Sequence, residues 1–234
     1  MSKIKQLVLP RKDEDGNYYI SYSQLSKWKR SKRNYMRHYF FGEPDDNAAL
    51  QEYGDFGHKV GEAYENKDFS AWEDDEAEFL QTLPHLDEFE REIKLRMDGF
   101  YILGFIDTNS KAEDVKLLDG STLYTYVKEL VDYKTGDIEK RSPEYQSEDY
   151  WQVDIYAAAL HQEYGKYPEK GSVVLIGRSG NAFAGEDLNL TMQAAIIDKP
   201  ISEERCKSVL KQVQEVAEEI SEYYQAYLKL KGDE

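Results

Sequence analysis

The sequence contains a single cysteine, Cys206, and no apolar run that approaches the roughly 20 residues of a membrane-spanning helix. One cysteine excludes an intramolecular disulfide and any iron–sulfur cluster held by four cysteines of this chain. Residues 1–10 lack the long apolar core of a signal peptide. These absences predict a protein of a reducing compartment, the cytosol, that has no membrane partner.

Positive charge is also scarce, since 30 Lys and Arg stand against 46 Asp and Glu and give a formal net charge of −16. Taken whole, this balance argues against a nucleic-acid-binding protein. The distribution is uneven, however: residues 1–41 hold ten Lys and Arg and three Asp and Glu, while residues 42–234 carry a net charge of −23. Any contact with DNA is therefore expected to use a local basic strip.

What is present suffices for a folded domain, because 40% of the 234 residues are hydrophobic and 13% are aromatic. We predict a single domain over residues 1–234. Its expected fold is α/β, with a central mixed sheet of about four or five strands flanked by helices.

Hydrophobic periodicity and turn residues predict the individual elements. Helices are expected over residues 21–41, 50–64, 150–163 and 202–230, and strands over residues 89–97, 100–108, 126–133 and 171–177. Asp98-Gly99 is typical of a two-residue hairpin turn. Residues 109–125 are expected to form a loop or a small hairpin, and residues 137–149 a polar loop.

Two short apolar segments, Gly104–Asp107 and Glu129–Asp132, each end in an acid, and the second is followed by Lys134. Side chains alternate along a strand, so Asp132 and Lys134 point to the same side. Two carboxylates and an ammonium at one point suit a Mg²⁺-dependent site that cleaves phosphodiesters. Taken alone, an acid and a lysine two residues apart on a strand more often form a solvated pair.

The first and last helices each allow two interpretations. The first carries a basic strip, Lys29, Arg30, Lys32 and Arg33, among aromatic residues. Either the charged side chains bind a phosphate backbone, or they are merely exposed to solvent on the helix surface. For the aromatic rings, packing in the protein core is favoured. The last helix has apolar positions in steps of three and four, which favours packing against the chain's own sheet, with self-association as the alternative.

The ordered motifs resemble a known family. Gly104-x-x-Asp107 followed by Asp132-Tyr133-Lys134 resembles the core of the PD-(D/E)XK nuclease superfamily, whose fold is restriction-endonuclease-like. The proline of the family's name is absent, because Ile106 precedes Asp107. The resemblance covers residues 19–176, which would form the nuclease core, and residues 202–230 would add a C-terminal helix.

Two further motifs resemble the RecB-type exonuclease branch of that superfamily. These are Gly57-His58 and Gln152-x-x-x-Tyr156. Some relatives place an iron–sulfur cysteine at the position of Ser31, so serine here implies that this chain has no cluster.

The resemblance implies a role for each motif residue. His58, Asp107, Asp132 and the backbone carbonyl of Tyr133 would bind Mg²⁺ or Mn²⁺, and Lys134 would position and activate the attacking water. Without the resemblance, His58 would more often be a structural histidine than a ligand.

The remaining motif residues would support the site or the substrate. Gln152 and Tyr156 would border the active site and contact DNA. Glu62 lies four residues from His58 on the same helix face and would either support the metal site or be solvated.

The function that the resemblance implies is metal-dependent hydrolysis of DNA. A short chain of this type resembles phage or prophage exonucleases, which act on linear duplex or single-stranded DNA beside a single-strand annealing protein in recombination or repair. It would work in the cytosol of a bacterial host. The alternative is a non-catalytic, nuclease-like subunit that binds DNA or a partner, against which the intact set of motif residues speaks.

Overall fold

The computed structural model describes residues 7–44 and 48–232, which belong to two compact units. One unit comprises Met1–Asp45, Glu92–Gly104 and Glu203–Glu234, and the other comprises Asp46–Arg91 and Phe105–Ser202. Strands β2 (Glu88–Arg96) and β3 (Tyr101–Asn109) run from one unit into the other.

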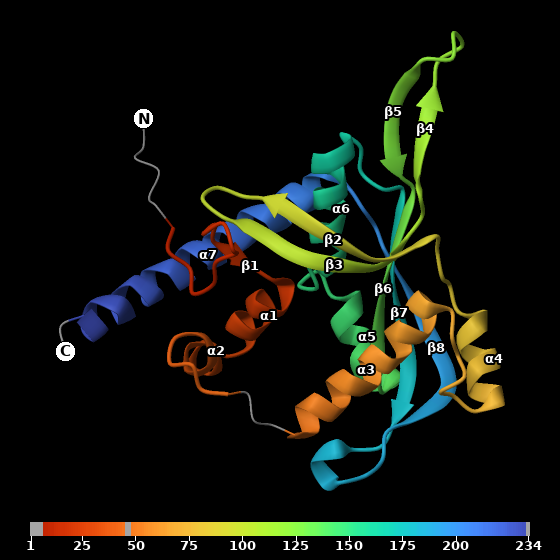
Figure 1. The fold of residues 1–234 in the computed structure, drawn as a ribbon, viewed down its shortest axis with the longest axis horizontal. Helices are drawn as coiled ribbons and strands as arrows, with labels where there is room; N and C mark the ends of the chain where they lie inside the picture. The colour runs from red at the N-terminus through yellow and green to blue at the C-terminus, as the bar shows by residue number, and fades with distance from the viewer. Residues whose placement is uncertain (1–6, 45–47, 233–234) are drawn as a thin grey trace. The chain divides into compact units, whose positions relative to one another are not determined.

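Along the chain, the helices α1–α4 are followed by the strands β2–β6, and helices and strands are interspersed after that (Figure 1). The other described strands are β1 (Tyr19–Ile20), β4 (Ala112–Lys116), β5 (Thr122–Val127), β6 (Glu129–Gly136), β7 (Lys170–Ser179) and β8 (Asn189–Lys199). The described helices are α1 (Tyr22–Arg30), α2 (Lys32–Tyr39), α3 (Ala48–Asn66), α4 (Asp74–Thr82), α5 (Ile138–Gln146), α6 (Gln152–Tyr164), the 3₁₀ turn η1 (Ala182–Ala184) and α7 (Glu203–Gly232).

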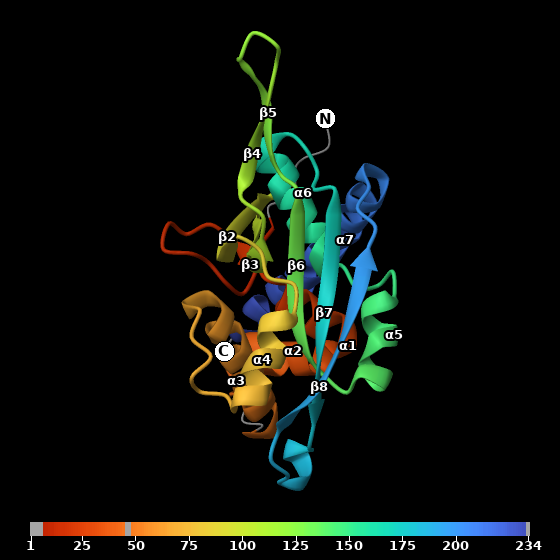
Figure 2. The same ribbon diagram turned by 90° about the vertical axis from the view of Figure 1, so that its right-hand side faces the viewer.

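The main sheet has the strand order β1-β3-β6-β7-β8, with β2 also paired to β3. The β6–β7 pair is parallel, while β3–β6 and β7–β8 are antiparallel, so the sheet is mixed. In the unit formed by Asp46–Arg91 and Phe105–Ser202, α3 and α4 lie on one face of β6, β7 and β8, and α5 and α6 lie on the other (Figure 2). The predicted α/β fold with a central mixed sheet is confirmed.

Strand β6 is buried on both faces, and its alternating side chains serve two purposes. Val131 packs with Val60 of α3 and Leu80 of α4 in a hydrophobic core. The Tyr133 ring lies on the same face, because it stacks 4.8 Å from the Tyr64 ring of α3. Asp132 and Lys134 have the opposite parity and therefore project from the other face.

The predicted helix over residues 21–41 is two helices, because Ser31 interrupts it. Ser21 caps α1 and accepts a hydrogen bond from the Gln24 amide, whereas Ser31 is extended and caps α2 through the Asn34 amide. A serine oxygen that binds a free amide favours a new helix start over continuation.

The aromatic residues of these two helices are core residues, as expected. Trp28 and Tyr35 are buried, and the Trp28 ring contacts Tyr35 and Tyr223 of α7 edge-on. Trp28 also donates a 2.8 Å hydrogen bond to Glu219. Helix α7 therefore packs on α1 of its own unit, while its expected packing against the sheet stays a prediction. No helix among residues 7–44 and 48–232 is long and apolar enough to cross a membrane.

Two elements next to the candidate site differ from the sequence prediction. The expected loop at residues 137–149 contains α5, which Asp137 caps by accepting from the Lys140 amide at 3.1 Å. The predicted strand over residues 126–133 is wrong at its start: Tyr126 and Val127 belong to β5, which forms a hairpin with β4 across Gly120 (φ 86°). This hairpin stands out from its unit in Figures 1 and 2.

The turn after β7 gives a test of the fold. Gly180 has φ +86°, and a Cβ there would lie 2.0 Å from the Asp187 carbonyl oxygen. Gly120 has the same φ of +86° but open space around it. We expect Gly180→Ala to lower the free energy of unfolding by roughly 2–4 kcal/mol, and Gly120→Ala by about 1 kcal/mol, because only the first adds a clash with backbone to the cost of left-handed geometry. Urea titrations measure both, and equal losses would contradict the packing around Gly180.

Candidate active site

Strands β3 and β6 separate at the point where the two predicted carboxylates meet. Their backbone pairing includes Thr108 opposite Val131, and one further step in that register places Asp107 opposite Asp132. At that step the Asp107 side chain replaces the backbone ladder, because its Oδ2 accepts the Tyr133 amide at 2.5 Å. Side chains directly opposite in an antiparallel pair lie on the same face. Asp107 and Asp132 therefore lie on the same face of the sheet, next to each other, at the point where the backbone pairing of the two strands ends.

Asp132 is fully buried and has two polar neighbours. Lys134 Nζ lies 2.8 Å from Oδ1 and 2.7 Å from Oδ2, and the Tyr150 hydroxyl lies 2.7 Å from Oδ2. A buried carboxylate is strongly destabilising unless it is paired and hydrogen-bonded. Lys134 and Tyr150 supply both requirements, so the geometry of Asp132 depends on them.

The ammonium of Lys134 indicates where a cation is held. It lies within hydrogen-bond distance of Asp132 and also 3.1 Å from the Tyr133 carbonyl oxygen. A carboxylate and a carbonyl oxygen converging on a positive charge are hard ligands of the kind that Mg²⁺ and Mn²⁺ prefer.

Electrostatics separate the roles of the three charged groups. Burial and the neighbouring charge of Asp132 raise the pKa of Asp107 to about 7, although Lys134 and the Tyr133 amide oppose the shift. Burial alone would lower the pKa of Lys134, but Asp132 and Asp107 outweigh it, so this pKa lies above its ordinary value. Lys134 therefore stays protonated near neutral pH, while Asp107 has the properties of a carboxylate that lacks a partner cation.

Glu90 is a neighbour of the site that the sequence did not indicate. It lies in β2 with φ 48°, a left-handed conformation that is rare for a residue other than glycine. Burial and Glu65 raise its pKa, and His58 and Lys134 act on it in the opposite direction. Glu90 also contributes to the raised pKa of Asp107. Its only sequence signal is an acid at an inner position of an expected strand.

His58 is placed on α3 with 73% of its side chain exposed, and its Nε2 lies 3.2 Å from Glu62. In the described part of the chain, no three His, Cys, Asp or Glu side chains are arranged to hold a metal ion. The structure thus brings Asp107 and Asp132 together but does not add His58 to them. The predicted ligand set stays a prediction.

Gln152 and Tyr156 form a network behind Asp132. The Tyr150 hydroxyl lies 2.9 Å from Gln152 Oε1, and Gln152 Nε2 donates to the Tyr156 hydroxyl at 2.6 Å. Tyr156 is only 4% exposed, and burial followed by the charges of Asp132 and Asp107 raises its pKa well above 10. The pair therefore contacts the site through Tyr150, a residue whose role the sequence did not reveal.

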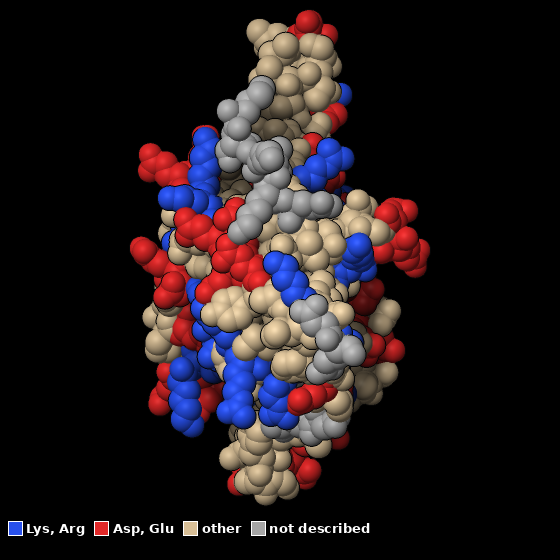
Figure 3. Space-filling view, turned by 90° about the vertical axis from the view of Figure 1, so that its left-hand side faces the viewer, with Lys and Arg blue, Asp and Glu red and all other residues tan. Residues whose placement is uncertain are grey.

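The basic strip lies on α1 and α2, and Lys29, Arg30 and Arg33 are exposed. Lys32 is also exposed but forms an ion pair with Glu219 of α7. Figure 3 shows lysine and arginine side chains gathered on one face of the molecule, with acidic side chains around them. The strip has the exposure that a contact with DNA requires, while the charge of Lys32 is already paired.

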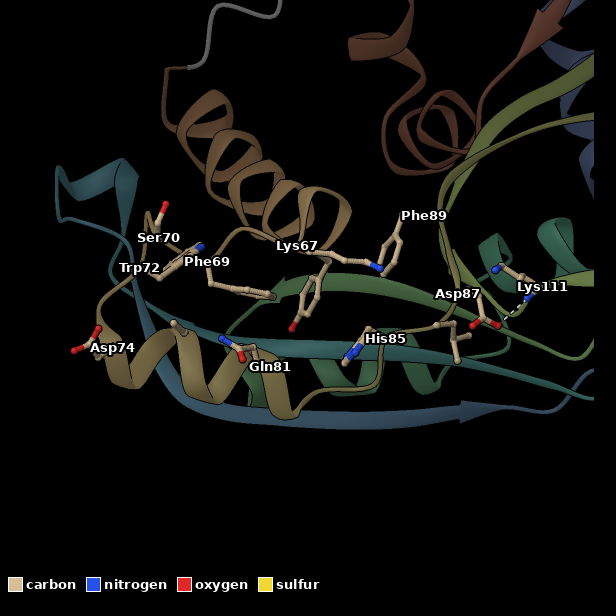
Figure 4. A pocket seen from close by; sticks show the side chains of 13 residues that line it. Lys67, Phe69, Ser70, Trp72, Asp74, Gln81, His85, Asp87, Phe89 and Lys111 are labelled. Carbon is tan, nitrogen blue, oxygen red and sulfur yellow. Dashed lines mark hydrogen bonds between the residues drawn. The ribbon is translucent and has the colours of Figure 1, made fainter.

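A groove of about 1180 Å³ opens elsewhere in the unit that contains Asp107 and Asp132. Figure 4 shows the side chains that line it, which include the aromatic residues Phe69, Trp72 and Phe89 and the charged residues Lys67 and Lys111. Neither aspartate lines it. The groove is therefore distinct from the candidate active site.

Comparison with protein-family models agrees with the resemblance inferred from the motifs. The family model described as the PD-(D/E)XK nuclease superfamily matches residues 127–229, which include Asp132, Lys134, Gln152 and Tyr156. A solved structure described as a "Putative exonuclease" from Eubacterium rectale has 10% sequence identity and a TM-score of 0.49, over 93% of this chain and 88% of that chain. No curated protein matches the sequence.

The raised pKa of Asp107 predicts how stability depends on pH in the presence of a chelator. Between pH 4 and pH 7 the folded protein binds more protons at Asp107 than the unfolded chain does, so this carboxyl lowers stability as the pH rises and its penalty is complete above pH 7. We expect Asp107→Asn to raise the free energy of unfolding by about 1–2 kcal/mol at pH 8 and to have little effect at pH 4.

Asp119 provides a control of opposite sign. Its hydrogen bonds with Ser121 lower its pKa, so its contribution to stability is present above pH 4 and is lost as the pH falls. Asp119→Asn should therefore destabilise the protein at pH 8. Denaturant titrations at the two pH values measure both variants, and a loss of stability for Asp107→Asn at pH 8 would show that Asp107 is already compensated.

Proposed function

We propose that this chain, whose residues 127–229 match the model of the PD-(D/E)XK nuclease superfamily, hydrolyses DNA phosphodiester bonds at a site formed by Asp107, Asp132 and Lys134. The observation that carries the proposal is the meeting of two carboxylates and a protonated lysine where β3 and β6 separate. A metal ion on Asp107, Asp132 and the Tyr133 carbonyl oxygen would stabilise negative charge on the scissile phosphate and on the leaving oxygen. Mg²⁺ and Mn²⁺ both suit these oxygen atoms.

His58 is proposed as a further ligand, for which its ring must leave Glu62 and turn towards the aspartates. An imidazole ligand favours Mn²⁺ over Mg²⁺. Glu62 would then hold the histidine ring and not the ion. This part of the proposal rests on the Gly57-His58 motif and on the electrostatic effect that His58 exerts on Glu90, beside the site.

Lys134 acts as a cation, because its raised pKa keeps the proton on Nζ. A protonated lysine cannot accept a proton from the attacking water. It can donate a hydrogen bond to that water or to a phosphate oxygen, and its charge stabilises the additional negative charge of the transition state. Tyr150, with Gln152 and Tyr156 behind it, keeps Asp132 in place during the reaction.

The finer proposal is an exonuclease of the RecB type that acts on linear duplex or single-stranded DNA in phage-type recombination or repair. Its support is the ordered set of motifs from Gly57-His58 to Tyr156. The basic strip on α1 and α2 is proposed to bind the DNA backbone. A single-strand annealing protein is the partner that this context implies.

Replacement of the lysine tests the catalytic role. We expect Lys134→Gln to lower the rate of cleavage of linear DNA in Mg²⁺ or Mn²⁺ by about 10²–10³-fold, because it removes charge that acts mainly in the transition state. The affinity for DNA should change little. Glutamine retains a donor for Asp132, and circular dichroism checks the fold. Unchanged cleavage by Lys134→Gln, or a parent protein that degrades neither duplex nor single strands, would refute the proposed function.

Metal binding has a readout that does not depend on activity. Saturating Mn²⁺ should raise the melting temperature of the parent protein, because a ligand that binds only the folded state stabilises it. The increase should be absent in Asp107→Asn and Asp132→Asn and smaller in His58→Ala, while Glu113→Gln on β4 serves as an acidic control. An increase in His58→Ala equal to that of the parent would return His58 to a structural role.

A further inference from the structure

Two arginines near the end of the sheet act on each other electrostatically, in the unit that contains the candidate active site. Arg178 is near the end of β7, and its guanidinium carbon lies 3.9 Å from the centre of the Tyr53 ring of α3. Arg141 lies on α5, and its guanidinium donates to the Tyr145 hydroxyl at 2.9 Å. Both side chains are partly buried.

These two guanidinium groups have unused capacity to bind an anion. The Nε atoms of Arg141 and Arg178 are buried without a hydrogen-bond partner among the described residues. Arg141 forms an ion pair with Glu144 at 3.2 Å, but no ion pair found in that part of the chain includes Arg178. Burial and the nearby charge of Arg141 lower the pKa of Arg178. Like charges that repel each other are stabilised by a bound anion.

An exposed aromatic ring lies next to the arginines. The Phe183 side chain of η1 is 63% exposed and its ring lies 5.8 Å from that of Tyr53. The Tyr53 hydroxyl holds the turn in place, because it accepts from the Ala182 amide at 3.0 Å and donates to Asn181. The turn therefore presents Phe183 to solvent beside Arg178, where it is available to stack on a base.

Arg141 of α5 lies over the end of β6, beyond the catalytic residues of that strand. Gly136 lies two residues after Lys134, which corresponds to about 7 Å along a strand. A Cβ at Gly136 would lie 3.0 Å from Arg141 Cγ, so Arg141 lies directly over this end of the strand. Tyr145, whose hydroxyl accepts a hydrogen bond from Arg141, also acts electrostatically on both Lys134 and Arg178. The nucleotide next to a phosphate cleaved at Lys134 would therefore lie near Arg141.

We propose that Arg141, Arg178 and Phe183 form a subsite that binds one nucleotide of the DNA strand next to the cleaved phosphate. The guanidinium groups bind the phosphate, and the exposed ring stacks on the base. This inference rests on the proposed nuclease function. It also addresses the net charge of −16, because a polyanion needs local cations to approach such a surface.

Binding without cleavage tests the subsite directly. The probe is a fluorescein-labelled oligothymidylate of roughly 10 nucleotides, within the usual length of a single-strand site, titrated in a chelator by fluorescence anisotropy. Arg178→Gln should weaken binding about 5–10-fold and reduce the salt slope by about 0.7, the value for one phosphate contact. Lys166→Gln is the matched control, because it removes a cation that lies 3.8 Å from the Tyr126 ring in the same unit.

Phe183→Ala tests the base contact at a position too exposed to affect folding. It should weaken binding about tenfold without changing the salt slope, and the loss should disappear with an oligonucleotide that is abasic at the neighbouring position. If both variants bind like the parent and Lys166→Gln, the subsite is wrong even if the parent cleaves DNA. If both bind more weakly but the parent cleaves nothing, the subsite holds and the nuclease function fails.

Discussion

The candidate site depends on the electrostatic repulsion between Asp107 and Asp132. These two carboxylates face each other where the backbone pairing of β3 and β6 ends. Asp132 is fully buried, so its charge requires Lys134 and the Tyr150 hydroxyl. Within residues 7–44 and 48–232, the Tyr133 amide is the one hydrogen-bond donor found for Asp107, and the pKa of Asp107 rises to about 7. A single lysine thus balances two carboxylates. In the proposed nuclease, a divalent cation would complete this balance.

Asp132, Tyr133 and Lys134 connect the chemistry to the core through the alternation of β6. Asp132 and Lys134 project towards α5 and α6, while the Tyr133 ring stacks on Tyr64 and its hydroxyl donates to the Pro84 carbonyl at 2.7 Å. The backbone of Tyr133 serves the site, because its amide binds Asp107 and its carbonyl accepts from Lys134. Packing on one face of the strand therefore fixes the polar groups on the other. An aromatic ring at this position is well suited to that purpose, because it cannot shift without moving the strand.

Signals that are local in sequence predicted the fold correctly, whereas features that depend on tertiary contacts were missed. Asp98-Gly99 and the alternation of β6 gave the strands that carry the aspartates. The break at Ser31 and the helix α5 were missed, because a serine or a polar run does not distinguish a cap from an interior position without its packing partner. In the site, Tyr150 and Glu90 were missed for the same reason. Tyr150 reaches Asp132 from 18 positions further along the chain, and Glu90 adopts a positive φ that no motif signals.

Charge restricts where an acidic chain can bind DNA. The net charge of −23 over residues 42–234 repels a polyanion from most of that surface, so any productive path must follow cations that lack an acidic partner. Several lysines do have an acidic partner: Lys32 pairs with Glu219, Lys140 with Asp137 and Lys170 with Glu129. Arg178, in the unit that contains the aspartates, differs from them: it forms no ion pair among the described residues, and its Nε has no hydrogen-bond partner there. In the proposed nuclease, cations that lack an acidic partner would therefore define where a DNA strand approaches the otherwise acidic surface.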